Sequence, residues 1–389
     1  MRAEIDYERH NAEVRQVWDA YHRGEPLRVP MILGINPRYT AFGHPANPRG
    51  LSFAQYFGDP ESMLTRQLEH QAWVRRHVPQ DAEMGLPEKG WEVYVDFLNS
   101  YEAGWFGCPL HYFDGEVPDT QPLLQDERRK WSLLKKGIPD PFSGGLMERN
   151  WAFCEYFKRR QEEGFTYLGK PIARVLPAGL GTDGPVTVAC NLRGAAEFLT
   201  DLAADPEYAR QLLAYITEAT LSRIRAYRQR LGQPQKTNGC GFADDAIQSL
   251  SIERYTEQVL PFHRQLIEGL SEPGANAIHL CGDATRFFPF LRDELSIRSF
   301  DTGFPIDFSW VRQALGPEVE VRGGPSVMFL QGATPAQVRE EVVRILKSGI
   351  SQGGRFILRE GNNLPPDVGL EQLWAMYDTV REFGRGLCF

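Results

Sequence analysis

The sequence predicts a parallel α/β fold, because short apolar segments alternate with amphipathic helical segments along its 389 residues. Eight of these apolar segments have the length of a strand, which favours a closed (β/α)8 TIM barrel over an open sheet. The predicted strands are roughly residues 29–35, 93–98, 172–177, 237–242, 275–280, 297–300, 319–322 and 355–358. No internal repeat of 20 to 50 residues is evident, which argues against a solenoid or a propeller.

Three of the helices between these segments have clear start signals. Asp205-Pro206-Glu207 offers an N-cap, a proline at the first helical position and an acid in the first turn, and Asp59-Pro60-Glu61 repeats this pattern. Thr334 and Gln337 have the spacing of a capping box. We therefore expect helices to begin at these three points.

Two regions fall outside the simple alternation of strands and helices. Residues 1–27 predict an N-terminal helical extension, since the apolar residues from Val14 to Tyr21 have helical spacing. Residues 100–170 are rich in Gly, Pro, Trp and Phe and fit the alternation poorly. We interpret them as a long elaboration that covers one face of the barrel, so that residues 1–389 form a single domain.

Composition argues against several classes of protein. The net charge is −8 and no Lys/Arg-rich run appears, which disfavours a nucleic-acid partner. No segment approaches the ~18 apolar residues of a membrane span, and the N-terminus lacks the apolar stretch of a signal peptide. The six scattered cysteines include no CxxC pair and fit reduced thiols. We expect a soluble, cytoplasmic protein that acts on a small molecule, and its oligomeric state stays open, a homodimer being compatible.

The sharpest chemical signal is His279-Leu280-Cys281-Gly282, at the end of an apolar strand candidate. Side chains alternate along a strand, so His279 and Cys281 point to the same side. Imidazole and thiolate together are good zinc ligands. Two ligands do not close a tetrahedral site, and the alternative is a buried strand end with an inert cysteine.

Carboxylates follow several strand candidates. Asp96 and Asp301 each come directly after apolar residues, where partial desolvation would raise the pKa and suit a general acid or base. Asp244 and Asp245 form an acidic pair that suits a metal, proton transfer or a cationic substrate. The alternatives are hydrogen bonds to nearby backbone amides for Asp96 and Asp301, and a turn in which the acidic pair caps the segment that follows it.

Two arginines also follow strand candidates. Arg38 and Arg322 could each hold a substrate carboxylate or phosphate by a bidentate contact, and an internal salt bridge is the alternative. The aromatic residues between Trp105 and Phe113 either line an apolar pocket or lie in the core.

Taken in order, several motifs resemble those of the uroporphyrinogen decarboxylase-like superfamily. The resemblance is good from about residue 170 to 385 and implies the same (β/α)8 barrel. It rests on segments 184–189, 205–207, 244–247, 251–255, 279–282, 334–354 and 365–366.

The His-x-Cys-Gly motif resembles the methyltransferase branch of that superfamily. This resemblance implies zinc on His279 and Cys281, a thiol acceptor and a corrinoid carried by a partner protein. Asn362 stands where that branch has a third zinc-ligand cysteine. We therefore expect the third ligand from Glu360, with Asp244, Cys240 or Asn362 itself as alternatives; otherwise the site holds no tightly bound metal. Where Asn362 is not a ligand, we expect it to contact substrate.

The sequence thus supports a methyl- or small-alkyl-group transferase as the leading hypothesis. The alternative is a metal-free decarboxylase or lyase in which Asp96 is the acid or base and Arg38 or Arg322 holds a substrate carboxylate. Asp96 resembles the decarboxylase aspartate, although the arginine-rich signature of that branch is replaced by Ile35-Asn36-Pro37-Arg38-Tyr39. A non-catalytic binding protein on the same barrel is the third hypothesis.

Overall fold

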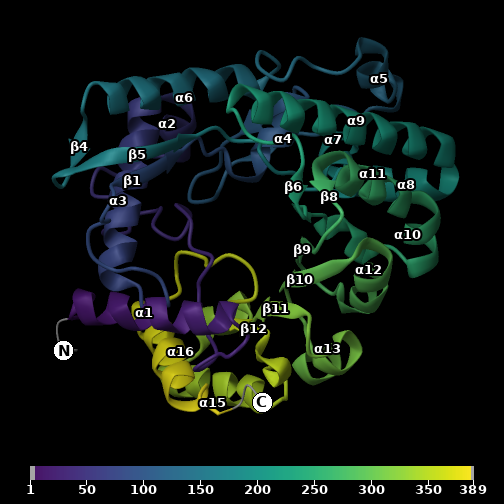
Figure 1. Ribbon diagram of the computed structural model, residues 1–389. Helices are drawn as coiled ribbons and strands as arrows, with labels where there is room; N and C mark the ends of the chain where they lie inside the picture. The colour runs from purple at the N-terminus through teal and green to yellow at the C-terminus, as the bar shows by residue number, and fades with distance from the viewer. Residues whose placement is uncertain (1–4, 387–389) are drawn as a thin grey trace.

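The computed structural model describes residues 5–386 as a ring of strands enclosed by helices (Figure 1). Met31 pairs in parallel with Leu358 and takes the place of the first strand. The structure is a (β/α)8 barrel, as predicted. Its strands are β1 (Trp91–Tyr94), β5 (Lys170–Leu176), β7 (Gly241–Ala243), β9 (Asn276–Leu280), β10 (Ile297–Thr302), β11 (Glu320–Gly323) and β12 (Phe356–Leu358).

Barrel strands that follow one another along the chain lie side by side in the ring. A five-stranded parallel sheet has the order β12-β11-β10-β9-β7, and β5 pairs in parallel with β1. The Ala243 N–H, in β7, donates to the Thr182 carbonyl just beyond β5 (3.1 Å) and links the two sheets. Parallel strands place all their carboxyl ends at one end of the barrel, which is where such barrels carry their active sites.

The predicted first strand, residues 29–35, is reduced to a single bridge. The Met31 N–H donates to Asp81 (2.7 Å) and the Leu33 N–H to Gln80 (2.9 Å). These side chains therefore replace the backbone hydrogen bonds that would pair this segment with β1. On its other side, the Ile32 N–H still donates to the Leu358 carbonyl of β12 (3.0 Å). An apolar pattern cannot reveal this substitution, because it reports burial and not the hydrogen-bond partner.

The predicted helix starts are confirmed. Asp205 caps α9 (Pro206–Arg230), Asp59 caps α3 (Pro60–His77), and Thr334 forms a capping box with Gln337 at α15 (Pro335–Leu346). The N-terminal helix is α1 (Tyr7–His22). The other helices of the ring and its loops are α2 (Phe53–Gly58), α7 (Pro185–Arg193), α8 (Ala195–Ala204), α10 (Ile252–Gln258), α11 (Leu260–Leu270), α12 (Phe288–Leu295), α13 (Phe308–Leu315), α14 (Val327–Gly332) and α16 (Leu370–Phe383).

The region 100–170 divides into two parts. Its last helix, α6 (Leu146–Glu162), packs on β5 and is the ordinary barrel helix between β1 and β5, so the prediction that the whole region departs from the alternation is wrong for this helix. The earlier part is irregular, and the Lys130 ammonium ties it to Asp201 (3.1 Å) and Asp205 (3.0 Å). The short elements of the region are α4 (Tyr101–Trp105), β2 (Leu110–His111), β3 (Asp119–Thr120), α5 (Ser132–Lys136) and β4 (Thr166–Tyr167).

The strand register builds two layers of side chains inside the barrel. The layer nearer the carboxyl ends consists of Ala243, His279, Asp301 and Arg322. The layer below it consists of Gly241, Ala277, Ser299 and Glu320. Because most of the lower layer is small, the interior keeps a cavity of about 390 Å³ that reaches His279 and Asp301.

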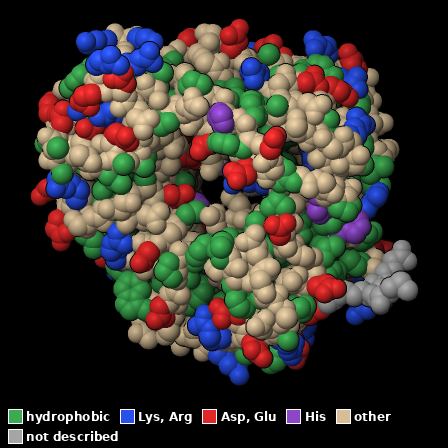
Figure 2. All heavy atoms as spheres, turned by 180° about the vertical axis from the view of Figure 1, so that it is seen from behind, with side chains coloured by type: hydrophobic (Ala, Val, Ile, Leu, Met, Phe, Trp, Pro, Cys, Tyr) green, Lys and Arg blue, Asp and Glu red, His purple; other side chains and the backbone are tan. Residues whose placement is uncertain are grey.

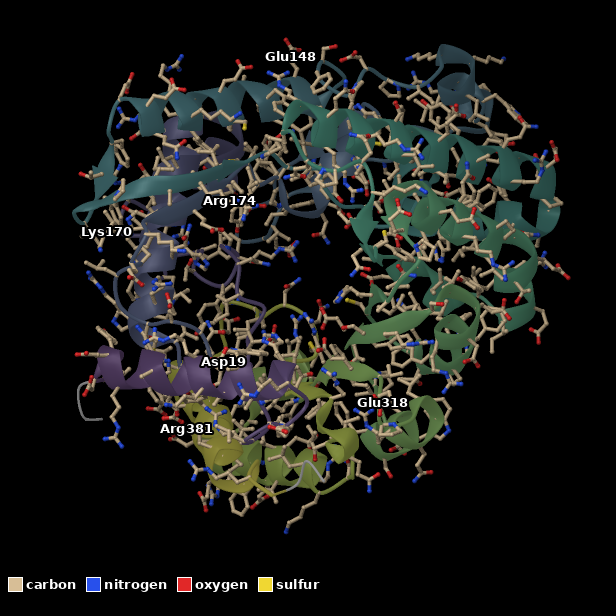
Figure 3. All side chains as sticks on the ribbon, viewed as in Figure 1. Asp19, Glu148, Lys170, Arg174, Glu318 and Arg381 are labelled. Carbon is tan, nitrogen blue, oxygen red and sulfur yellow. The ribbon has the colours of Figure 1, made fainter. Side chains whose placement is uncertain are left out.

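The interior is open and polar. Figure 2 shows a hollow with acidic side chains at its rim in the middle of the molecule. Figure 3 shows polar side chains extending into this opening, while Glu148, Lys170 and Glu318 lie at the outer surface. A small pair of strands, β6 (Thr237–Asn238) and β8 (Ser271–Glu272), lies beside the main sheet. No helix within residues 5–386 combines the length and apolarity needed to cross a bilayer.

Candidate metal and catalytic site

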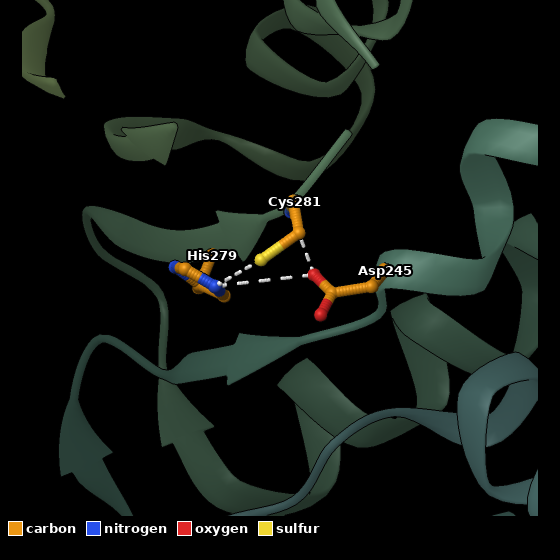
Figure 4. A group of neighbouring side chains, drawn as sticks. All are labelled: Asp245, His279 and Cys281. Carbon is orange, nitrogen blue, oxygen red and sulfur yellow. Dashed lines mark hydrogen bonds and ion pairs between the residues drawn. The ribbon is translucent and has the colours of Figure 1, made fainter. Parts of the chain in front are cut away.

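Three potential metal ligands meet where β7 and β9 end. Asp245 follows β7, His279 lies in β9 and Cys281 comes directly after it (Figure 4). The His279 Nε2 lies 3.0 Å from the Cys281 Sγ and 4.0 Å from the Asp245 Oδ1. The three ligand atoms lie within 4.8 Å of one another. The predicted convergence of His279 and Cys281 is therefore what the structure shows, and Asp245 joins them.

Hydrogen bonds fix the orientation of this group. The Cys281 N–H donates to the Asp245 Oδ1 (2.7 Å), and the His279 Nδ1 lies 2.8 Å from the Asp301 Oδ2. Arg359 donates to the same Asp301 oxygen (2.7 Å). A carboxylate on one ring nitrogen of a histidine is the usual arrangement when the other nitrogen binds a metal, so Nε2 is the nitrogen left for an ion.

The proton affinities of this group reflect the same contacts. Burial opposes the charged imidazolium, but the hydrogen bonds to Asp301 and Cys281 outweigh it and raise the pKa of His279 to about 10. Burial raises the pKa of Cys281 above its ordinary value, although His279 partly offsets it. Both ligands thus hold protons at neutral pH in the metal-free protein, and a bound cation would have to displace them.

The donor set suits zinc. Zinc binds a thiolate, an imidazole and a carboxylate readily, and catalytic zinc sites use three protein ligands with a fourth position left open. Asp245, His279 and Cys281 supply these three donors, and Asp301 supports the histidine from behind. The residues present therefore fit a catalytic zinc ion.

The structure corrects the prediction for the third ligand. Glu360 is fully buried and accepts hydrogen bonds from the Gly34 N–H (2.9 Å) and from Arg359 (3.1 Å). Burial raises the pKa of Glu360 to about 7. Glu360 and Cys240 lie outside the group of potential ligands, whose third member is Asp245.

Asn362 is likewise not part of the group. Its side-chain oxygen accepts from the N–H of Asn363 (2.8 Å), and its φ is 87°. Asn362 thus closes a tight turn after β12, and the structure shows no contact between it and the three ligands. Its predicted contact with substrate stays a prediction.

Asp244 caps a helix and has no free oxygen for catalysis. One oxygen accepts from Thr187 (2.7 Å) and the other from Val186 (3.1 Å), both at the N-terminus of α7, and His263 lies 2.8 Å from the second. Gly184 allows this close approach, since a Cβ there would lie 2.2 Å from a carbonyl oxygen of β7. The expectation of a catalytic Asp244 is therefore corrected. The alternative was a cap on the segment that follows the acidic pair, whereas the helix that Asp244 caps is α7, which precedes it.

A second polar group lies across the mouth of the barrel. Asp96 accepts from the Tyr56 hydroxyl (2.9 Å) and the Leu98 N–H (2.9 Å). Burial raises the pKa of Asp96, and the Leu98, Tyr56 and Arg38 contacts offset this only in part. Asp96 therefore has the perturbed carboxyl that the sequence predicted.

Arg38 connects the two groups. It donates to Asn99 (3.1 Å), while its buried Nε has no partner among residues 5–386. Burial lowers the pKa of Arg38, and the charges of Asp96, Asp183 and Cys281 oppose this shift. Arg38 thus lies between the acids and the metal ligands, with hydrogen-bonding capacity to spare.

Arg322 and Asp301 are engaged within the protein. Arg322 donates to the Glu320 Oε1 (2.8 Å), which is the internal salt bridge that was the alternative to substrate binding. Its side chain remains 43% exposed to the cavity. Asp301 is held by His279 and Arg359, and burial is outweighed by these contacts, so its pKa is lowered. Asp301 therefore orients His279 and is unsuited to act as a free base.

Two residues of the site were missed by the sequence analysis. Asp183 precedes Gly184, and burial together with the charges of Glu102 and Asp245 raises its pKa to about 8. Arg359 directly follows β12 and bridges Asp301 and Glu360. Both residues lie in segments that follow a strand, as Arg38 does, and this position could have identified them.

Comparisons with known proteins agree with this architecture. The sequence model of the family described as "Uroporphyrinogen decarboxylase (URO-D)" matches residues 163–383. A "Methylated-thiol--coenzyme M methyltransferase" of Methanosarcina mazei is 32% identical over 287 residues, which cover 69% of this chain and 69% of that protein. A uroporphyrinogen decarboxylase of Trichlorobacter lovleyi is 26% identical over 232 residues, or 56% of this chain and 64% of that protein.

Solved structures show the same fold. A methyltransferase from Methanosarcina mazei superposes with a TM-score of 0.64 at 17% sequence identity, covering 95% of this chain and 98% of that one. At this identity the likeness establishes the barrel and not the activity. With the family match over more than half of the chain, the conclusion is that this protein belongs to the uroporphyrinogen decarboxylase (URO-D) family.

Proposed function

We propose that the protein is a methyltransferase, or a transferase of a similarly small alkyl group, with a zinc-activated thiol acceptor and a methyl-corrinoid donor carried by a partner protein. The observation that carries the proposal is the group Asp245, His279 and Cys281, with Asp301 behind the histidine. The similarity to a methyltransferase at 32% identity supports the same reaction class.

Each residue of the metal group has a distinct task. Asp245, His279 and Cys281 would hold zinc, and Asp301 keeps the Nε2 of His279 directed at the ion. A zinc-bound thiol loses its proton near neutral pH, which supplies the nucleophile for methyl transfer. Arg359 holds Asp301 in place by its hydrogen bond (2.7 Å).

The residues across the mouth bind the acceptor. The partly exposed guanidinium of Arg38 suits an anionic group on the thiol, because an arginine presents several donors in a fixed plane. Asp183, whose pKa is raised to about 8, keeps its proton at pH 7 and can donate a hydrogen bond to a bound substrate. These two side chains select and orient the acceptor without contributing a metal ligand.

The test is methyl transfer from free methylcobalamin to 3-mercaptopropionate by zinc-loaded protein, followed by the absorbance of cob(I)alamin and the yield of the methyl thioether. We expect turnover by the wild type and by Cys240→Ala, which changes a buried cysteine outside the metal group. Cys281→Ala should lose it. Equal turnover by Cys281→Ala would refute the assigned role of the cysteine.

A metal-free decarboxylase is the second candidate, and the Asp96–Arg38 group favours it. Asp96 has a raised pKa and lies beside a guanidinium that could hold a substrate carboxylate. Two relatives named uroporphyrinogen decarboxylase share 25% and 26% identity with this chain. CO2 release from a porphyrinogen carboxylate that is lost in Asp96→Asn and unaffected by Cys281→Ala would establish this candidate in place of the first.

A further inference from the structure

A pocket of about 210 Å³ lies between two loops at the mouth of the barrel, and we call it the mouth pocket. Its walls come from residues 37–56 and 113–116, together with Arg66. The first loop follows Met31, and the second joins β2 to β3 within the segment between β1 and α6. Both segments follow barrel strands, as Asp245 and Cys281 do, and so belong to the carboxyl end of the barrel.

Four aromatic rings contribute to the walls of the mouth pocket. Phe42 and Phe53 lie 5.7 Å apart at 62°, and Phe53 and Tyr56 lie 6.2 Å apart at 86°. Phe113 faces them from the other loop. Edge-to-face contacts of this kind leave ring faces and edges open to a further ring.

The two outermost rings are unusually exposed. Phe42 is 44% and Phe113 is 45% exposed, although both are large and apolar. Phe42 also has a φ of 51°, a conformation that costs free energy for a residue with a side chain. Burial of this exposed apolar surface on both sides of the pocket would favour the binding of a ligand.

The floor of the mouth pocket is held rigidly. Arg66 donates to the Ala46 carbonyl (2.8 Å). Asn47 bonds Leu51 in both directions (3.1 and 3.0 Å). These polar groups are engaged inside the loop, so the pocket is preformed and offers its apolar surface to a ligand.

The mouth pocket shares a wall with the polar group at the mouth. The Tyr56 hydroxyl donates to Asp96, and Pro37, which lines the pocket, precedes Arg38. Asp114 and Glu116 lie exposed on the second loop and line the pocket too. Their charges favour a neutral occupant over an anionic one.

We propose that the mouth pocket binds a single neutral aromatic ring that forms part of the substrate. A cavity of about 150 Å³ lined by apolar side chains is large enough for benzene, so 210 Å³ accommodates one substituted ring. The assignment of the ring to the substrate rests on the proposed function, whereas ring binding itself does not.

The test compares phenol with cyclohexanol, two neutral alcohols of similar size, by calorimetric titration of the full chain. We expect phenol to bind about two- to tenfold more tightly, since aromatic pairs attract each other beyond the effect of the area they bury. Phe113→Ala should weaken phenol binding by a similar factor. Leu86→Ala, which removes a side chain of matched exposure (43%) outside the mouth pocket, should not.

Equal affinity for the two alcohols, or an unchanged phenol affinity in Phe113→Ala, would overturn the inference. Phe113 is exposed, so its replacement leaves the core intact. Phenol should bind Cys281→Ala as it binds the wild type. Phenol binding without methyl transfer would therefore remove the proposed function alone, and methyl transfer without phenol binding would remove the mouth pocket alone.

Discussion

The two sides of the barrel mouth are built in different ways. On the metal side, His279 and Asp301 lie on paired strands in register, and Asp245 and Cys281 follow strand ends. On the opposite side, the chain between Met31 and β5 supplies Arg38, Asp96 and the mouth pocket from loops. Strand ends hold reacting groups precisely placed, whereas loops can vary to suit a substrate.

The family match follows the same division. It covers residues 163–383, which include Asp183 and the whole metal side but neither Arg38 nor Asp96. Under the proposed function, the matched residues include the metal ligands, while Arg38 and the mouth pocket lie in the N-terminal part of the chain. Variants on the two sides should accordingly affect different measurements.

The largest effect is expected from Asp245→Ala. Removing a direct ligand should lower zinc affinity more than about 100-fold, beyond the 10- to 100-fold typical of outer contacts. Glu360→Gln, which changes the carboxylate that the sequence nominated, should leave zinc affinity within a few-fold. Competition with a chromogenic chelator measures both, and the reverse order of effects would return the third ligand to Glu360.

Asp301→Asn should act less strongly on the same side. The amide still fills the space beside His279 but no longer supports its charge, so zinc affinity should fall about 10- to 100-fold. The measurement is again chelator competition, with Ser299→Ala in the same strand as the matched control. A change no larger than that of the control would mean that Asp301 does not support the metal.

Arg38→Met should separate recognition from metal binding. Losing a charged hydrogen bond of about 1.5–3 kcal/mol should raise the KM for 3-mercaptopropionate about tenfold or more. The KM for neutral 2-mercaptoethanol and the zinc content should stay unchanged. An equal rise in KM for both thiols would show that Arg38 does not recognise the charge of the acceptor.

The smallest effect concerns stability and pH. The pKa of Asp183 is raised from 3.8 to about 8 in the fold, so the folded protein binds the proton more tightly than the unfolded chain. Asp183 therefore stabilises the fold at low pH, and this contribution to the free energy of unfolding is lost as pH rises from about 4 to about 8.

Asp183→Asn removes this dependence. In chelator-treated protein, the free energy of unfolding of the variant relative to the wild type should increase between pH 5 and pH 8, because only the wild type loses this stabilisation over that range. Denaturant titration at the two pH values measures it. A constant difference would mean that Asp183 is already ionised at pH 5.

Much of the barrel was predictable because its signals are local. The caps at Asp59, Asp205 and Thr334 act within one helical turn, and apolar strands report their own burial. The same locality explains the convergence of His279 and Cys281, which depends only on alternation along one strand.

The remaining features depend on contacts between distant segments. Asp245 and Asp244 are adjacent, yet the fold turns one to the metal group and the other to the N-terminus of α7. The Glu360 carboxylate accepts a hydrogen bond from the Gly34 N–H, more than 300 residues away in sequence, and lies outside the metal group. The raised pKa of Asp183 also arises from neighbours on other elements, so no local pattern could assign it.

The most direct test of the account is the zinc content of the purified protein, measured by elemental analysis on the wild type, Cys281→Ala and Cys240→Ala. We predict about one zinc ion per chain in the wild type and in Cys240→Ala, and its loss in Cys281→Ala. Zinc retained in Cys281→Ala, or absent from the wild type after expression with added zinc, would contradict the metal site.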